Sequence, residues 1–148
     1  MEESSRPARV LIVAHRTAAT PGLADAVRRR AAEGPAIFTL LVPRTAHGLH
    51  RLMDPEDSSD SEAGEILERA LPILSGAAGR PVEGMIGDPA PLTAIQDAIN
   101  REHYDEIVIS TLPTHVSRWL RLDLPSKARG LGLPVTVITP ADDVRATG

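Results

Sequence analysis

The sequence of 148 residues contains no cysteine, which excludes disulfide bonds, thiol catalysis and zinc–thiolate sites. Aromatic residues are nearly absent as well, since Phe38, Tyr104 and Trp119 are the only ones. So few rings do not supply the stacking platform on which proteins bind single-stranded nucleic acid. The net charge of −4 also argues against a general nucleic-acid surface. We therefore expect no nucleic-acid partner.

Long apolar runs are missing too, so we expect no transmembrane segment and no membrane partner. The first five residues are polar and acidic, which is unlike a secretory signal, and we predict a cytoplasmic protein. The length corresponds to one domain by the usual size range. We predict a single domain over 1–148, with flexible tails at 1–7 and 141–148.

Short apolar runs alternate with amphipathic segments along the chain. Three of these runs are predominantly apolar, which is typical of strands covered on both faces; they lie at 10–14, 37–42 and 107–109. Residues 135–138 are predicted to form the last strand. Residues 82–86 do alternate, which predicts a strand at the edge of a sheet. The sequence therefore contains five candidate strands.

Helical periodicity predicts a helix between each pair of strands. The first begins near Thr20-Pro21, with Arg28 to Arg30 on its solvated face, and the second begins at Ser61. Pro72 is expected to kink or split the second helix. Strict alternation predicts a Rossmann-like α/β fold: an open five-stranded parallel sheet flanked by helices on both faces.

In such sheets, ligands bind beyond the carboxyl ends of the strands, where the winding reverses. If the first strand is central, this point lies between the first and fourth strands. The residues that follow these strands, His15 to Thr17 and Ser110 to His115, are then the candidate site.

The sequence lacks the common phosphate-loop, dinucleotide, zinc-protease and serine-hydrolase motifs. His47 and His50, with Asp54 nearby, are too few convergent ligands for a metal site. We therefore predict no metal ligands and no catalytic residues, and we expect a binding protein rather than an enzyme.

A basic segment follows the fourth strand. Arg118, Arg121 and Lys127, with the hydroxyls of Ser117 and Ser126, are suited to an anion, and a helix starting near Ser126 would add N–H donors. In the alternative interpretation, Trp119 packs down and the arginines are simply solvated.

The chain resembles the universal stress protein family in three stretches: 9–14, 87–99 and 105–137. Members that bind ATP carry Asp at the end of the first strand, where this chain has Ala14-His15. They also carry glycines in the pattern G-x-x-G-x9-G-[ST] after the fourth strand. In the best alignment Leu112, His115 and Pro125 replace the glycines and Ser126 matches the hydroxyl. Gly87, which begins a Gly-Asp-Pro turn, matches a family position near the nucleotide.

The resemblance implies a small binding or regulatory protein of the stress response, with ATP or another adenine nucleotide as its possible ligand. It also implies a homodimer formed through the last strand, Val135 to Ile138. One alternative is a member that has lost nucleotide binding and acts through protein–protein contacts; a weak nucleotide-hydrolysing enzyme ranks last. The candidate ligand-binding residues are Ala14, His15, Arg16, Gly87, Ser110, Thr111, His115, Arg118, Arg121 and Ser126.

Overall fold

Strands and helices alternate along the computed structural model, which describes residues 6–45, 55–112 and 117–139. Short connections join most of them, and no strand separates the last two helices, α4 and α5. In chain order they are β1 (Ala8–Val13), α1 (Pro21–Glu33), β2 (Ala36–Pro43), α2 (Pro55–Ala78), β3 (Glu83–Gly87), α3 (Pro91–Arg101), β4 (Glu106–Ser110), α4 (Arg118–Arg121), α5 (Leu124–Arg129) and β5 (Val135–Ile138).

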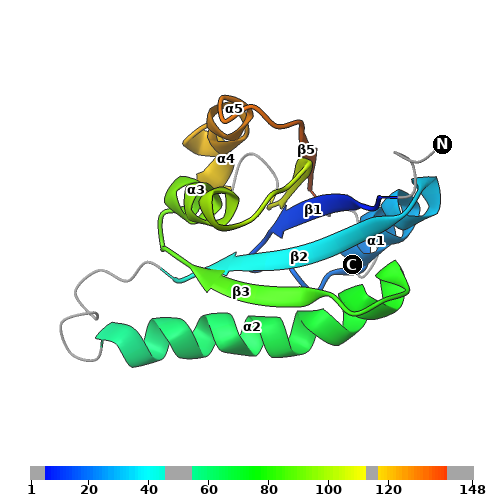
Figure 1. Ribbon diagram of the computed structural model, residues 1–148. Helices are drawn as coiled ribbons and strands as arrows, with labels where there is room; N and C mark the ends of the chain where they lie inside the picture. The colour runs from blue at the N-terminus through cyan, green and yellow to red at the C-terminus, as the bar shows by residue number, and fades with distance from the viewer. Residues whose placement is uncertain (1–5, 46–54, 113–116, 140–148) are drawn as a thin grey trace.

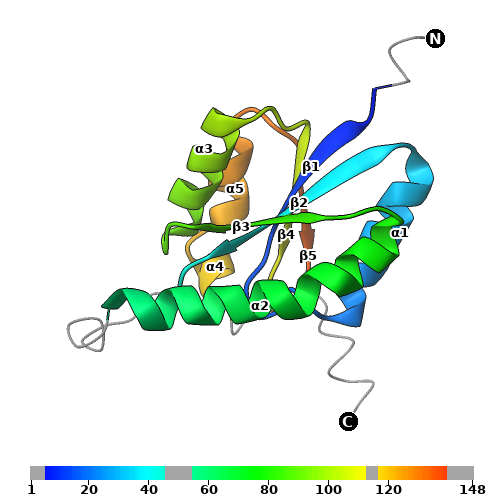
Figure 2. The ribbon, with the colours of Figure 1, turned by 60° about the horizontal axis from the view of Figure 1, so that its bottom comes forward.

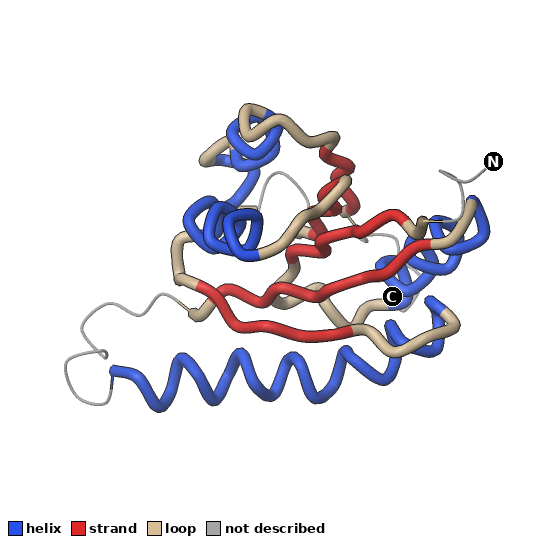
Figure 3. The backbone as a smooth tube through the Cα atoms, viewed as in Figure 1, coloured by secondary structure: helices blue, strands red, loops and turns tan. Residues whose placement is uncertain are grey.

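The five strands form one parallel sheet in the order β3-β2-β1-β4-β5 (Figures 1 and 3). This confirms the predicted α/β fold class. The strand encoded first is central, β3 is at an edge as its alternating pattern predicted, and the winding reverses between β1 and β4.

Helices cover both faces of the sheet: α1 and α2 lie on one side, and α3 and α5 on the other (Figure 2). Successive residues of β1 divide between the two layers because strand side chains alternate in direction. Val10 and Ile12 pack in the core under α1 and α2, whereas Leu11 and Val13 pack under α3 and α5. All four side chains are fully buried, so the unbroken apolar run is explained.

The helix that follows β1 begins where the sequence predicts. The Thr20 hydroxyl caps it by accepting a hydrogen bond from the Leu23 N–H, and Pro21 occupies the first turn. By contrast, α2 begins at Pro55 rather than Ser61 and continues through Pro72. Of the two expected effects, a kink or a split, the structure therefore excludes the split. Burial of Ala70, Leu74 and Ala77 against the sheet offsets the lost backbone bond, which costs roughly 3 kcal/mol.

The arginine run on α1 also differs from expectation at one position. Arg28 and Arg29 are exposed, as predicted for a solvated face. Arg30 instead turns toward the sheet, where its guanidinium pairs with the Glu106 carboxylate at the start of β4. Helical periodicity alone does not reveal this partner, because Glu106 lies 76 positions away.

Candidate functional site

A cleft of about 830 Å³ lies beyond the carboxyl ends of β1, β2 and β4. This volume falls within the range of about 300–1,000 Å³ that is usual for small-molecule sites. The cleft coincides with the reversal of winding between β1 and β4. Its polar lining comprises His15, Arg16, Thr17, Arg44, Thr45, Asp88, Ser110, Thr111, Ser117 and Arg118, and its apolar lining comprises Pro43, Pro89, Ala90, Pro91, Leu112, Trp119 and Leu122.

His15, the second residue after β1, begins a chain of side-chain hydrogen bonds that leads out of the cleft. Its Nε2 lies 2.9 Å from Thr45 Oγ1, and Thr45 Oγ1 donates to Glu62 Oε1 over 2.7 Å. Because the single hydroxyl hydrogen of Thr45 goes to Glu62, Thr45 must accept from His15. This bonding assigns the proton to Nε2 and leaves Nδ1 as an acceptor in the neutral ring.

The electrostatic surroundings keep His15 neutral at neutral pH. Burial is the largest influence, and it lowers the pKa of His15 below the ordinary value of 6.5. The negative charge of Glu62 acts in the opposite direction, and the positive charge of Arg16 lowers the pKa further. The ring therefore enters the site as a hydrogen-bonding group rather than as a cation.

Four buried hydroxyl groups, those of Thr17, Ser110, Thr111 and Ser117, line the cleft in two pairs. Thr17 Oγ1 lies 2.6 Å from Ser110 Oγ, and Thr111 Oγ1 lies 2.6 Å from Ser117 Oγ. Ser117 also caps α4 by accepting from the Leu120 N–H over 3.1 Å. The first pair joins the segment after β1 to the last residue of β4, as the predicted topology requires, whereas the second lies within the segment after β4.

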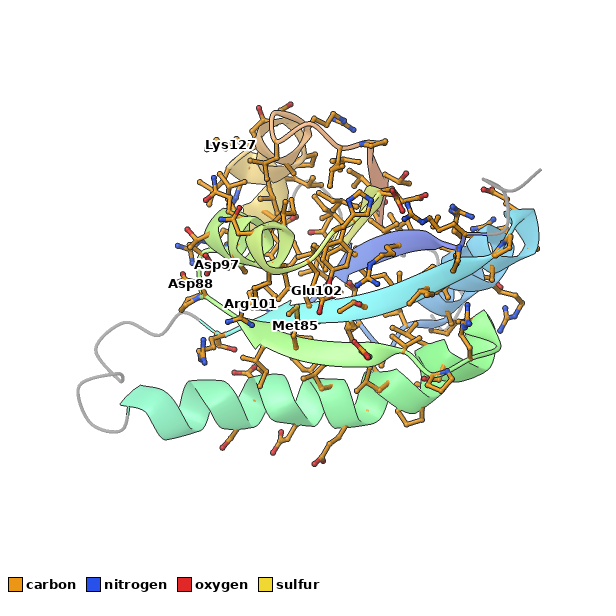
Figure 4. All side chains as sticks on the ribbon, viewed as in Figure 1. Met85, Asp88, Asp97, Arg101, Glu102 and Lys127 are labelled. Atoms are coloured by element: carbon orange, nitrogen blue, oxygen red, sulfur yellow. The ribbon has the colours of Figure 1, made fainter. Side chains whose placement is uncertain are left out.

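Among the described residues that line the cleft, arginines outnumber carboxylates. The arginines are Arg16, Arg44 and Arg118, and the carboxylate is that of Asp88. Asp88 Oδ1 accepts from the Ala90 N–H over 2.9 Å, which fixes the turn before α3; Figure 4 shows Asp88 at the carboxyl end of β3. Arg44 donates to the Gly87 carbonyl from both its backbone N–H and its Nη1. The site is therefore suited to an anion.

One wall of the cleft is apolar. Leu112, Trp119 and Leu122 contribute to it, and Leu122 is 52% exposed. Trp119 also packs against the core beneath α3 and α5, as one interpretation of the sequence expected. These side chains form the wall without filling the cleft. An apolar wall beside arginine side chains suits a ligand with both a ring and an anionic group.

Five of the ten predicted ligand-binding residues line this cleft together: His15, Arg16, Ser110, Thr111 and Arg118. Among the others, Ala14 is fully buried in the core. Gly87 is at the end of β3, and its close neighbours are Ala94 and Leu41, where a Cβ would lie 2.8 and 2.9 Å from their side chains. The structure thus gives Gly87 a packing role.

Two more of the predicted residues, Arg121 and Ser126, are exposed and do not line the cleft, and His115 lies outside the described residues. The helix expected to start near Ser126 starts at Leu124, after Asp123 in a left-handed conformation (φ 61°). Ser126 therefore lies in the first turn of α5. Lys127 is on α5 too, well separated from Asp88 (Figure 4).

Sequence reasoning missed Arg44, Thr45 and Glu62. Arg44 and Thr45 directly follow β2, whose carboxyl end lies beside that of β1 in the sheet. Ligands bind beyond the carboxyl ends of the strands, and this rule selected His15. It would also have selected Arg44 and Thr45 once the strand order was known. Glu62 reaches the site from α2, and its place in the sequence gives no such signal.

A second cavity of about 750 Å³ lies at the opposite ends of β1 and β2. Four of its polar residues form a network: Arg9 donates from its backbone to Asp105 and from its side chain to Glu102 and the His103 carbonyl. His103 in turn pairs with Asp105. This network closes the N-terminal end of the sheet, so we assign it a structural role. Across the described parts of the chain, no three metal-binding side chains gather.

No family model matches this sequence, and no curated protein is significantly similar to it. Several solved structures are similar in fold. A universal stress protein from Archaeoglobus fulgidus has a TM-score of 0.65 at 17% identity, over 93% of this chain and 98% of that one. An Archaeoglobus fulgidus universal stress protein in complex with dAMP has a TM-score of 0.59 at 18% identity, and another solved in complex with cAMP has 0.58 at 17%; each covers 90% of this chain and 98% of the other.

These likenesses confirm, at the level of the fold, the resemblance seen in the sequence: the chain has the universal stress protein fold. In the described residues, no helix is both long and apolar enough to cross a membrane.

Proposed function

We propose that this chain is a small binding protein of the universal stress type, which takes an adenine nucleotide or a similar phosphate-bearing molecule into the β1/β4 cleft and acts as a regulator. The observation that carries the proposal is the composition of the cleft at the switch point. Arginine and hydroxyl side chains face one volume large enough for a nucleotide, and an apolar wall with Trp119 stands beside them.

The fold comparison supports the same class of ligand. Two of the similar structures were solved with dAMP and cAMP, which share an adenine ring and one phosphate. In this chain, Arg16 and Arg118 provide the charge for a phosphate, and Trp119 offers a face for a ring. Side-chain charge thus compensates for the glycines that the sequence lacks.

Binding is best tested by calorimetric titration with AMP, cyclic AMP and ATP, together with thermal unfolding. A ligand that binds only the native state raises the melting temperature by mass action. Arg118→Ala removes a guanidinium from the cleft. We expect it to weaken binding about tenfold or more, because a charge-assisted hydrogen bond to the ligand is lost.

The matched control is Arg121→Ala, since Arg121 is exposed on the same short helix but does not line the cleft. Its affinity should equal that of the wild type. If no nucleotide binds to the wild-type protein, this proposal is wrong, and a role in protein–protein contacts becomes the better explanation.

We also propose a homodimer through β5. This strand pairs with β4 on one side and ends the described sheet on the other, so its second edge offers backbone groups for pairing with a copy of itself. Its side chains are largely apolar and only partly buried.

A further inference from the structure

The four hydroxyl groups of Thr17, Ser110, Thr111 and Ser117, here called the hydroxyl floor, lie deep in the cleft. Each of these residues is between 1% and 6% exposed. Within the described parts of the chain, the floor makes one hydrogen bond inside each pair and accepts one from the Leu120 N–H. None of the four oxygens has a further partner there.

Counting hydrogens shows that the floor has donors to spare. Each hydroxyl carries one hydrogen, and each pair uses one of its two hydrogens for the bond between the oxygens. Whichever oxygen donates, one O–H in each pair keeps no acceptor among the described residues. The bond from Leu120 occupies a lone pair of Ser117 and does not change this count. Buried donors are normally satisfied, so these two indicate an acceptor supplied from the cleft.

The nearby charges indicate which acceptor fits. Arg16 and Arg118 line the same cleft, and neither has a carboxylate partner in the described residues. Asp88, the acidic residue among the described lining residues, already accepts the Ala90 N–H. A phosphate group has several acceptor oxygens and carries one or two negative charges. It can therefore accept from both spare hydroxyls and from the two guanidinium groups at once.

We infer that the hydroxyl floor is a phosphate subsite that takes one phosphate group without a divalent cation. Two arginine charges balance the phosphate, and two side-chain O–H groups replace the backbone N–H donors that a glycine-rich loop would provide. The inference rests on the proposed function, because it names which part of the cleft holds the anionic end of the ligand.

The test is calorimetric titration of AMP in excess EDTA with Thr17→Val, Ser110→Ala and the double variant. Each single substitution removes one hydroxyl of the Thr17–Ser110 pair and with it the hydrogen bond inside the pair. The remaining O–H is then free to donate to the phosphate. We expect each single variant to lose less than about threefold in affinity. The double variant removes the donor altogether and is expected to lose about tenfold or more, which exceeds the product of the two single effects.

The control is Thr39→Val, since Thr39 is a buried threonine of β2 that does not line the cleft. It should bind AMP like the wild type, and circular dichroism should show that every variant is folded. Unchanged affinity in the double variant would mean that the floor holds only water; that result overturns this inference and leaves the proposed function standing. Binding that appears only with Mg²⁺ would overturn the metal-independent subsite in the same way.

Inorganic phosphate serves as a second probe. If the wild type binds phosphate but no nucleotide, and the double variant loses phosphate, the inference holds and the proposed nucleotide ligand is wrong. If the wild type binds neither nucleotide nor phosphate, the proposed function and the phosphate subsite are both overturned.

Discussion

Arg30 on α1 and Glu106 at the start of β4 form a forked ion pair. Arg30 Nη2 lies 2.8 Å from Glu106 Oε2, and Arg30 Nε lies 3.1 and 3.2 Å from the two carboxylate oxygens. The two side chains are 22% and 24% exposed. The hydrogen bond to Glu106 is the main reason that the pKa of Arg30 is raised. The pair ties a covering helix to the centre of the sheet.

We expect Glu106→Gln to lower the free energy of unfolding by about 1–2 kcal/mol. This value lies between the small effect of exposed ion pairs and the larger cost of breaking buried ones. The control is Asp25→Asn, which removes the partner of Arg28 in an exposed pair on the same helix and should cost less than about 0.5 kcal/mol. Urea unfolding measures both. Equal losses would show that burial gives the Arg30 pair no advantage.

Burial of His15 predicts a pH dependence of stability. Because its pKa is lowered in the folded state, the unfolded chain binds the proton more readily. Stability therefore increases with pH through the interval between the folded pKa and 6.5, and it is fully present above 6.5. We expect the wild type to lose more stability than His15→Gln when the pH falls from neutral to 5.

The same measurement, urea unfolding at several pH values, separates this effect from that of other groups. Asp105 has a lowered pKa, chiefly through the hydrogen bond from the Arg9 backbone, and its contribution is lost only as the pH falls through the acidic range. Parallel stability curves for the wild type and His15→Gln above pH 5 would contradict the prediction.

Three glycine-to-alanine substitutions should differ in sign and size. At Gly87 the new Cβ would lie 2.8 Å from the Ala94 Cβ, a group that has no rotamer to change, so we expect a loss of about 1–3 kcal/mol. At Gly84 the nearest atom is the end of the Leu67 side chain at 2.7 Å, which can rotate, so the loss should be smaller. Gly76 is helical with nothing within 4 Å, and alanine there should add about 0.5–1 kcal/mol.

Thermal and urea unfolding of these variants rank the three positions. If Gly87→Ala is as stable as the wild type, the tight packing of β3 against α3 is not what requires glycine there.

The proposed dimer predicts a specific effect of proline in β5. The Ile107 and Thr111 N–H groups donate to the carbonyls of Pro134 and Ile138, so the two-residue period of the strand turns the Val137 N–H toward the free edge. We expect Val137→Pro to give a folded monomer, because it removes a donor of the dimer and none of the β4–β5 ladder. Light scattering should find the wild type at twice the mass of the chain.

Val137→Ala keeps the N–H and is the control, expected to remain a dimer. A wild-type protein that is monomeric at all concentrations would rule out the dimer directly.

The sequence determined the fold class because its signals are local. A continuous apolar run such as 10–13 is stable only when both faces of the strand are covered, and Thr20-Pro21 specifies a helix start through its own cap. The alternating pattern of 82–86 likewise placed β3 at an edge. The strand order then located the cleft, and His15, Arg16, Ser110 and Thr111 were predicted on that basis.

Only the tertiary structure decided which side chains meet. The Thr17–Ser110 hydrogen bond joins residues 93 positions apart, and the path from His15 through Thr45 to Glu62 joins three separate segments. Arg30 faces the sheet instead of solvent, and Arg121 does not line the cleft, although both belong to similar basic runs in the sequence. The physical reason is that periodicity fixes the direction of a side chain relative to its own helix or strand. Its partners depend on strand register and helix packing, which the whole chain sets together.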